Sequence, residues 1–151
     1  MILSLNSDKL IVVAEEVEAT MRMFVLGHEG AREAGGIFIG CYRGPHVEVD
    51  HCTVPQPGDI RLKFLFHRKD EAHRRRAMEA WRNSGSIRTC VGEWHSHPED
   101  YPSPSWMDKC NWRRILQRQG SEPLLFMIVG REGVWAALGT NRAIKQLRVV
   151  E

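Results

Sequence analysis

The middle of the chain contains the segment Gly92-Glu93-Trp94-His95-Ser96-His97-Pro98. Residues 88–97 predict a β-strand that runs into Pro98. Three prolines between residues 98 and 104 exclude a regular element from the next segment. A helix is then predicted over residues 105–119, because Ser105 is suited to its N-cap and Gly120 lies just past its end.

The spacing of two histidines in this unit indicates a metal site. His95 and His97 are two residues apart, which on a strand puts both side chains on one face, roughly 7 Å apart along the backbone. Asp108 falls in the first turn of the predicted helix, and the proline-rich loop can fold that turn back toward the strand end. Three protein ligands that leave a fourth position for water are typical of catalytic rather than structural zinc.

Two simpler interpretations remain open from these residues alone. An isolated pair of histidines at this spacing is often structural, and Ser105 with Asp108 also matches a helix capping box that needs no metal. The proton-transferring group is open as well, because Glu93 and Glu99 lie nearest to the histidines in the sequence. Ser96 points to the opposite strand face from its neighbours, so we expect it to pack or to hydrogen-bond structurally.

The spacing of these residues is similar to the JAMM signature of the JAB/MPN metalloprotease family. The matching pattern is His95-x-His97-Pro98, six residues, Ser105, two residues and Asp108. That signature also has an upstream glutamate before a glycine-containing apolar strand, which is resembled by Glu33-Ala34-Gly35-Gly36-Ile37-Phe38-Ile39-Gly40. The resemblance covers nearly the whole chain and implies one JAB/MPN (cytidine-deaminase-like) domain over residues 1–151.

The resemblance also implies a role for each matched residue. His95, His97 and Asp108 would hold one Zn²⁺ per chain. Glu33 would act as the general base, and Ser105 would donate a hydrogen bond to the oxyanion of the tetrahedral intermediate. Glu93 is then expected to support the site or to form a salt bridge rather than to be the base.

The substrate-binding residues are unknown; the candidates are Gly35, Gly36 and Trp106, with Tyr101 as a weaker one. Gly35 and Gly36 could let another backbone approach closely, so that an extended tail would pair with a strand edge there or along residues 94–97. Trp106 could border the substrate groove, and Tyr101 is a weaker candidate of the same kind. The other nearby tryptophans, Trp94 and Trp112, are expected in the core.

Within the family, the compact chain resembles the bacterial JAB deconjugases of type II CBASS anti-phage operons. That resemblance implies a peptidase or isopeptidase that removes a cGAS-like nucleotidyltransferase (CD-NTase), conjugated through its C-terminus in a ubiquitin-like manner, from its target. The implied partner is a protein with an extended C-terminal tail. The alternatives are a peptidase that processes a ubiquitin-like or sulfur-carrier protein, an unrelated metal hydrolase, and a non-enzymatic scaffold that uses the fold for binding.

The other periodic segments predict an α+β fold with a mixed, mostly antiparallel sheet flanked by helices. Further helices are predicted over residues 14–26, with Gly27 as the stop, and over residues 70–81. Further strands are predicted over residues 37–39, 46–54, 61–66, 124–129, 134–138 and 145–150, and residues 11–13 begin either a strand or the first helix.

Composition narrows the class of protein. The chain has 151 residues, of which 42% are hydrophobic and 26% charged, so it is expected to be globular rather than disordered. A net charge of +2 is too small to indicate a nucleic-acid ligand. One basic stretch spans residues 67–76, which is typical of a solvated helix face, with a contact for an acidic partner as the alternative.

No membrane or export segment is indicated. The longest apolar run, residues 124–129, is far shorter than the roughly 18 residues that a membrane span needs, and residues 1–10 do not resemble a signal peptide. None of the four cysteines forms a C-x-x-C pair, so they are expected to be reduced and mostly buried. A cytoplasmic location is therefore expected.

Overall fold

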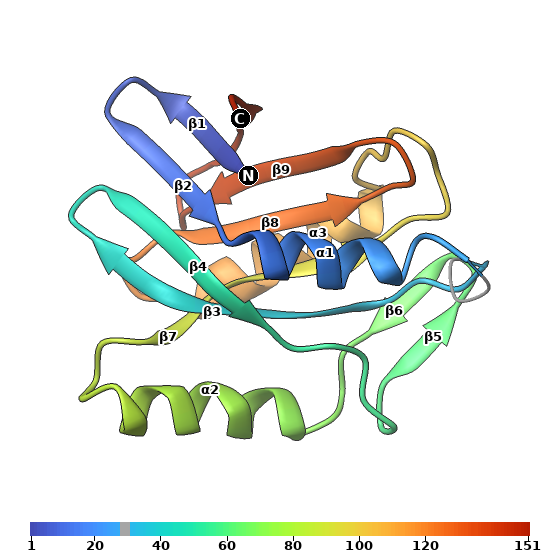
Figure 1. The fold of residues 1–151 in the computed structure, drawn as a ribbon, viewed down its shortest axis with the longest axis horizontal. Helices are drawn as coiled ribbons and strands as arrows, with labels where there is room; N and C mark the ends of the chain where they lie inside the picture. The colour runs from blue at the N-terminus through green and yellow to red at the C-terminus, as the bar shows by residue number, and fades with distance from the viewer. Residues whose placement is uncertain (28–30) are drawn as a thin grey trace.

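The computed structural model describes residues 1–27 and 31–151 around one large mixed sheet (Figure 1). The sheet has nine strands in the order β10-β9-β8-β7-β3-β4-β2-β1-β11. Its pairs are antiparallel except β2 with β4 and β7 with β8, which confirms the predicted α+β class and mixed, mostly antiparallel sheet. The strands are β1 (Ile2–Asn6), β2 (Lys9–Val13), β3 (Gly35–Arg43), β4 (His46–Cys52), β7 (Thr89–Ser96), β8 (Leu124–Val129), β9 (Val134–Gly139), β10 (Ile144–Gln146) and β11 (Arg148–Val149).

The sheet curls until its two ends meet. β10 pairs with β9 at one end and β11 pairs with β1 at the other, yet only Leu147 separates them in the sequence. The Leu147 side chain is buried, and its N–H donates to the carbonyl of Ala136. The prediction of one strand over residues 145–150 is therefore wrong, because a buried leucine divides this segment between two sheet ends.

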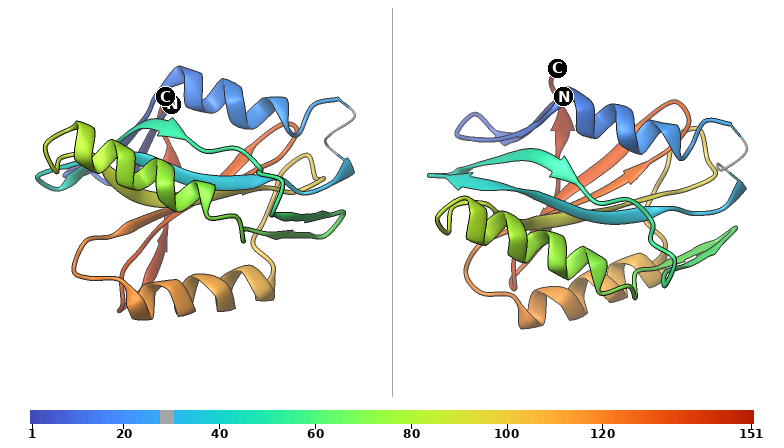
Figure 2. Two further views of the ribbon diagram at one scale, coloured as in Figure 1. Left: turned by 90° about the horizontal axis from the view of Figure 1, so that it is seen from below. Right: turned by 60° about the horizontal axis from the view of Figure 1, so that its bottom comes forward.

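Three helices cover the two faces of the sheet, and the alternation of β8 shows how. Leu125 and Met127 pack in the cluster that contains the buried side of α1 (Glu15–Met23). Phe126 and Ile128 face the other way and pack against Trp112 of α3 (Trp106–Arg118). α2 (Ala72–Asn83) packs through Ala80 on Ile37 and Ile39 of β3. Figure 2 shows α1 and α3 on opposite sides of the sheet.

Two further strand predictions are corrected by the structure. Residues 61–66 are not one strand but parts of a separate two-stranded hairpin, β5 (Ile60–Leu62) and β6 (Leu65–His67), in which Leu62 pairs with Leu65 across a two-residue turn. That turn contains no glycine, proline or asparagine to indicate it. The N-terminal strand β1 was not predicted. The sequence feature that indicates it is a polar turn between two apolar runs within residues 1–13.

The helix predictions hold with shifted ends. α1 ends at Met23, three residues before the predicted end, and turn-type hydrogen bonds continue from Met21 and Arg22 to Leu26. α2 begins at Ala72, and the Asp70 side chain accepts the N–H of that residue. α3 has the predicted Ser105 as its N-cap. Shifts of this size are ordinary for helix ends.

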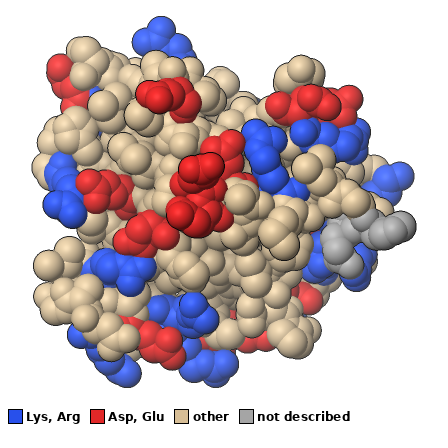
Figure 3. All heavy atoms as spheres, in the orientation of Figure 1, with Lys and Arg blue, Asp and Glu red and all other residues tan. Residues whose placement is uncertain are grey.

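The basic stretch 67–76 is less uniform than a solvated helix face. Arg68 forms an ion pair with Glu93, and His73 is fully buried. Arg74, Arg75 and Arg76 are exposed on α2, and Figure 3 shows basic side chains along the α2 side of this view and acidic ones over its middle. The structure therefore supports the solvated interpretation for the helical arginines only.

The cysteines were expected to be mostly buried, and the structure buries two of the four. All four cysteines are unpaired; Cys41 and Cys52 are buried, whereas Cys90 and Cys110 are partly exposed. Among the described residues, no helix is long and apolar enough to cross a membrane.

Candidate metal and catalytic site

His95, His97 and Asp108 converge at the end of β7, as the sequence predicted. The Nε2 atoms of His95 and His97 are 3.1 Å apart. Oδ1 of Asp108 lies 3.2 Å from Nε2 of His95, and its Oδ2 lies 3.3 Å from Nε2 of His97. These three residues form a group that could hold a metal ion.

The separations fit one tetrahedral ion. Ligand atoms roughly 2.0–2.1 Å from a tetrahedral zinc lie roughly 3.3–3.4 Å from one another. The three distances above come close to this range, with a different oxygen of Asp108 facing each imidazole. Two imidazoles and one carboxylate are also a ligand set that zinc accepts in catalytic sites. The donor set and its spacing therefore suit zinc.

The local fold explains how these side chains meet. His95 and His97 follow the alternation of β7, on the face that α3 covers, and His97 continues the strand by donating its N–H to the carbonyl of Val129. The loop after Pro98 is held by the turn between β8 and β9, since Arg131 donates its N–H to the carbonyl of Glu99. A Cβ on Gly130 would lie 2.6 Å from that carbonyl oxygen, so only glycine allows this close contact.

A complete capping box fixes Asp108. Ser105 Oγ accepts the N–H of Asp108 at 3.1 Å, and Oδ2 of Asp108 accepts the N–H of Ser105 at 2.8 Å. The capping interpretation is thus confirmed, and it does not compete with the metal interpretation, because the same carboxylate also faces both imidazoles. Burial opposes ionisation of Asp108, yet hydrogen bonds from His95 and His97 hold its pKa well below the ordinary value.

Glu33 lies beside this cluster, although it is far from it in the sequence. Its Oε1 is 3.7 Å from Nε2 of His97, and the residue is buried. Burial raises the pKa of Glu33 above its ordinary value, and the charges of His95 and His97 offset part of that rise. A carboxylate with a raised pKa next to the cluster is suited to accept a proton.

The β5–β6 hairpin contacts Glu33. Its main-chain N–H donates to the carbonyl of Leu62 at 2.8 Å, and Nε of Arg61 donates to its carbonyl at 3.0 Å. The main-chain N–H of Phe66 also faces the Glu33 carboxylate and lowers its pKa. Behind it, Ser96 Oγ accepts the N–H of Ala34, which is the structural role expected for Ser96.

The two nearer glutamates have other partners. Glu93 accepts Nη2 of Arg68 at 2.8 Å and Nε1 of Trp112 at 3.1 Å, so the expected salt-bridge role is confirmed. Arg68 as its partner was not foreseen. Glu99 lies 3.5 Å from Nδ1 of His97, on the ring edge that faces away from the cluster, where a carboxylate orients the imidazole.

The two segments expected to offer a strand edge, Gly35–Gly36 and residues 94–97, pair with neighbouring strands instead. Gly35 and Gly36 of β3 pair with His95 and Trp94 of β7, and β7 is itself covered on its other side by β8. A Cβ on Gly36 would lie 2.0 Å from the carbonyl oxygen of Thr53. Both glycines therefore allow close contacts within the fold, and their part in substrate binding stays a prediction.

The aromatic residues divide as expected. Trp94 and Trp112 are both 1% exposed and belong to the core. Trp106 and Tyr101 are 78% and 77% exposed. Trp106, between Ser105 and Asp108, therefore remains a candidate for the border of a substrate groove.

The comparisons with known proteins agree with this geometry. A model of the family described as prokaryotic homologs of the JAB domain matches residues 21–144. The chain belongs to this family. The matched region contains every residue of the site, namely Glu33, His95, His97, Ser105 and Asp108, and the resemblance to the JAB/MPN family is thereby confirmed.

Individual relatives align with most of the chain. A "CD-NTase/cGAS isopeptidase" of Pseudomonas aeruginosa is 40% identical over 135 residues, which are 88% of this chain and 85% of the relative. A protein of the same description from Vibrio cholerae is 34% identical over 97% of this chain and 92% of its own. A probable metalloprotease of Sinorhizobium fredii is 28% identical over 84% of this chain and 80% of its own.

A solved structure shares the fold. The solution structure of a Desulfitobacterium hafniense protein superposes with a TM-score of 0.58 at 18% identity, over 90% of this chain and 88% of that one. At this identity the likeness concerns the fold alone.

Proposed function

We propose that this chain is a zinc-dependent JAMM-type isopeptidase that releases a CD-NTase from a target to which it is joined through its C-terminus, in anti-phage defence. The observation that carries the proposal is the convergence of His95, His97 and Asp108 with Glu33 beside them. The substrate follows from the isopeptidase relatives that align with nearly the whole chain. A cytoplasmic location follows from this role and stays a prediction.

The residues divide the work of hydrolysis. His95, His97 and Asp108 would hold one zinc ion, which when bound supplies a Lewis acid for the scissile carbonyl and lowers the pKa of water toward about 7. Glu33 takes the proton of the attacking water and passes it to the leaving amine. Ser105 Oγ accepts from Asp108 N–H, so its own proton is free to donate to the developing oxyanion.

The acyl-side tail must reach Glu33 in an extended form, and the β5–β6 hairpin is the element that we propose to receive it. The hairpin is a separate two-stranded sheet that contacts Glu33. It exposes apolar side chains beside the site, since Leu62 is 54% exposed and Phe64 is 76% exposed. Main-chain pairing would hold a tail with little dependence on its side chains.

The proposal is tested with purified protein and a CD-NTase carrying a peptide or protein fused after its C-terminus. Release of intact CD-NTase that stops on zinc removal and returns with zinc would support the function. Cleavage of a ubiquitin-like or sulfur-carrier fusion with no cleavage of the CD-NTase fusion would favour the processing peptidase instead. No cleavage of any fusion by the zinc-loaded protein would contradict both.

A further inference from the structure

A buried polar network joins β4, α2 and the base of the β5–β6 hairpin. Nδ1 of His73 lies 2.6 Å from Oγ1 of Thr53, and its Nε2 lies 2.7 Å from Oδ2 of Asp59. The His73 side chain is 1% exposed and that of Asp59 is 0% exposed. Burying three polar groups together is costly unless each is hydrogen-bonded, so the network must stabilise a specific arrangement.

Asp59 closes the base of the hairpin. Its Oδ1 accepts the N–H groups of Lys69 and Asp70, which follow β6, while its Oδ2 also accepts the N–H of Gln56. Asp70 completes the closure by accepting the N–H of Gly58 at 2.8 Å. The chain before β5 and the chain after β6 are thus held together by two carboxylates.

His73 connects this closure to the sheet. Thr53 Oγ1 accepts the N–H of Ile37 in β3 at 2.9 Å, and the Thr53 N–H donates to the carbonyl of Ile37. Every group is satisfied when Nε2–H of His73 donates to Asp59 and the Thr53 hydroxyl donates to Nδ1. These hydrogen bonds connect β3, the strand that follows Glu33, to the base of the β5–β6 hairpin, which itself contacts Glu33.

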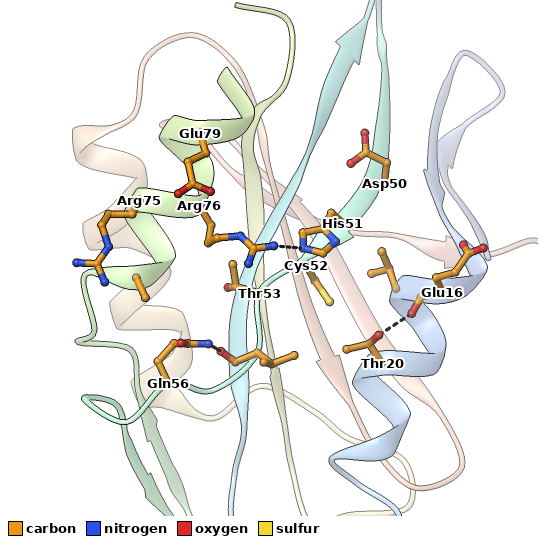
Figure 4. Close-up of a pocket in the computed structure, with 13 residues that line it drawn as sticks. Glu16, Thr20, Asp50, His51, Cys52, Thr53, Gln56, Arg75, Arg76 and Glu79 are labelled. Carbon is orange, nitrogen blue, oxygen red and sulfur yellow. Dashed lines mark hydrogen bonds between the residues drawn. The ribbon is translucent and has the colours of Figure 1, made fainter. Parts of the chain in front are cut away.

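The same three groups have the order of a nucleophile triad, and Thr53 lines a cavity of about 550 Å³ between α1, β4 and α2 (Figure 4). Thr53 is, however, only 6% exposed, and its oxygen already accepts the Ile37 N–H. A hydroxyl engaged in this way is not presented for attack. The geometry points to a structural link rather than to a second reaction centre.

We propose that Asp59, His73 and Thr53, here named the hairpin clamp, are positioning residues that hold the β5–β6 hairpin against Glu33. The proposal rests on the function proposed above. The path is short: the hairpin clamp fixes both ends of the hairpin, and the hairpin holds the main chain of Glu33 through Leu62 and Arg61. A displacement of about 1 Å at a reacting group can lower the rate roughly 100-fold.

The test compares kcat, zinc content and melting temperature for Thr53→Val, Thr53→Ser and Asp59→Asn. Thr53→Val removes the hydroxyl at nearly constant shape, and we expect bound zinc to remain while kcat falls about 10- to 100-fold. Thr53→Ser restores the hydroxyl and should recover most of the loss. Leu147→Ala, a buried substitution outside the hairpin clamp and the site, is the control for a general loss of stability.

Amide hydrogen exchange of residues 56–70 tests the hairpin clamp in the unaltered protein, so this test does not require any variant to fold. In the unaltered protein, the amides of Lys69 and Asp70 should be protected, and rapid exchange there would overturn the hairpin clamp. In Thr53→Val, the hairpin amides should exchange faster than in Leu147→Ala at equal loss of melting temperature.

The outcomes separate the hairpin clamp from the proposed function. If the unaltered protein has no zinc-dependent turnover, the proposed function fails. If Glu33→Gln is fully active, the base is misassigned, and the hairpin clamp, which acts through Glu33, fails with it. If Glu33→Gln is inactive but the folded, zinc-loaded Thr53→Val and Asp59→Asn variants keep the kcat of the unaltered protein, only the hairpin clamp fails.

Discussion

Replacement of Ser105 by alanine separates the two roles of this residue. The substitution removes the hydrogen bond from Asp108 N–H to Ser105 Oγ. The reciprocal bond to Asp108 Oδ2 can remain, because its donor is the main-chain N–H of residue 105. Loss of a serine N-cap costs about 1 kcal/mol. For a chain of this length, that corresponds to a fall in melting temperature of roughly 2–4 °C.

The expected loss of rate is much larger than the loss of stability. Removal of one oxyanion donor lowers kcat by roughly 10²–10³, which is about 2.7–4 kcal/mol. Loss of the cap lowers the free energy of unfolding by about 1 kcal/mol and leaves a protein of ordinary stability almost entirely folded at 25 °C. It therefore cannot account for such a loss of rate. The assay is single-turnover cleavage of the CD-NTase fusion at 25 °C, with zinc content measured on the same sample.

Ser105→Gly is the matched control for the cap. Glycine at an N-cap costs only a few tenths of a kcal/mol, so this variant should keep nearly the full melting temperature and still lose the same rate as Ser105→Ala. If both variants turn over at the rate of the unaltered protein while Ser105→Ala melts earlier, Ser105 is a cap only and its assigned role in the reaction is wrong.

Three further predictions concern the base, the loop and the substrate. Glu33→Gln should retain zinc and lose turnover, because the proton acceptor is gone while the ligands remain. Elemental analysis measures the zinc and the cleavage assay measures the turnover. Zinc loss in this variant, or inactivity of Glu93→Gln instead, would show that the base is misassigned. Gly130→Ala should destabilise the protein by about 1–3 kcal/mol in urea unfolding, because the new Cβ would lie 2.6 Å from the Glu99 carbonyl oxygen. The control Gly120→Ala should be neutral, because no atom lies within 4 Å of its Cβ. Equal effects of the two substitutions would count against a tightly held loop. Cleavage should depend on the folded protein upstream of the cut and tolerate varied residues downstream in a fusion series; the reverse dependence would remove the case for a deconjugase.

The grouping of the three proposed metal ligands could be predicted because their geometry is local. His95 and His97 share a face by strand alternation alone, and a short loop returns Asp108 to them. Glu33 could not be chosen in this way, because more than 60 residues separate it from His95 in the sequence. Only a loop and the pairing of two strands bring it to the site. Only the family resemblance ranked it above Glu93, and the structure shows why Glu93 is unsuited: both of its oxygens already accept hydrogen bonds.

Sequence patterns could not predict the β5–β6 hairpin or the contacts of the hairpin clamp. His73 lies within a run of basic residues that indicates a solvated helix face, yet it is buried because Thr53 and Asp59 approach it from other elements. The turn inside residues 60–67 has no turn-forming residue. Both features depend on long-range contacts rather than on local preference, which is where reasoning from periodicity fails.

The most direct test of the account is a zinc titration of metal-free protein, followed by cleavage of the CD-NTase fusion at each point. The account predicts no turnover without metal and a linear rise that stops at one zinc per chain, with no zinc retained by His95→Ala or His97→Ala. Full turnover in the metal-free protein, or full zinc binding by either histidine variant, would contradict it.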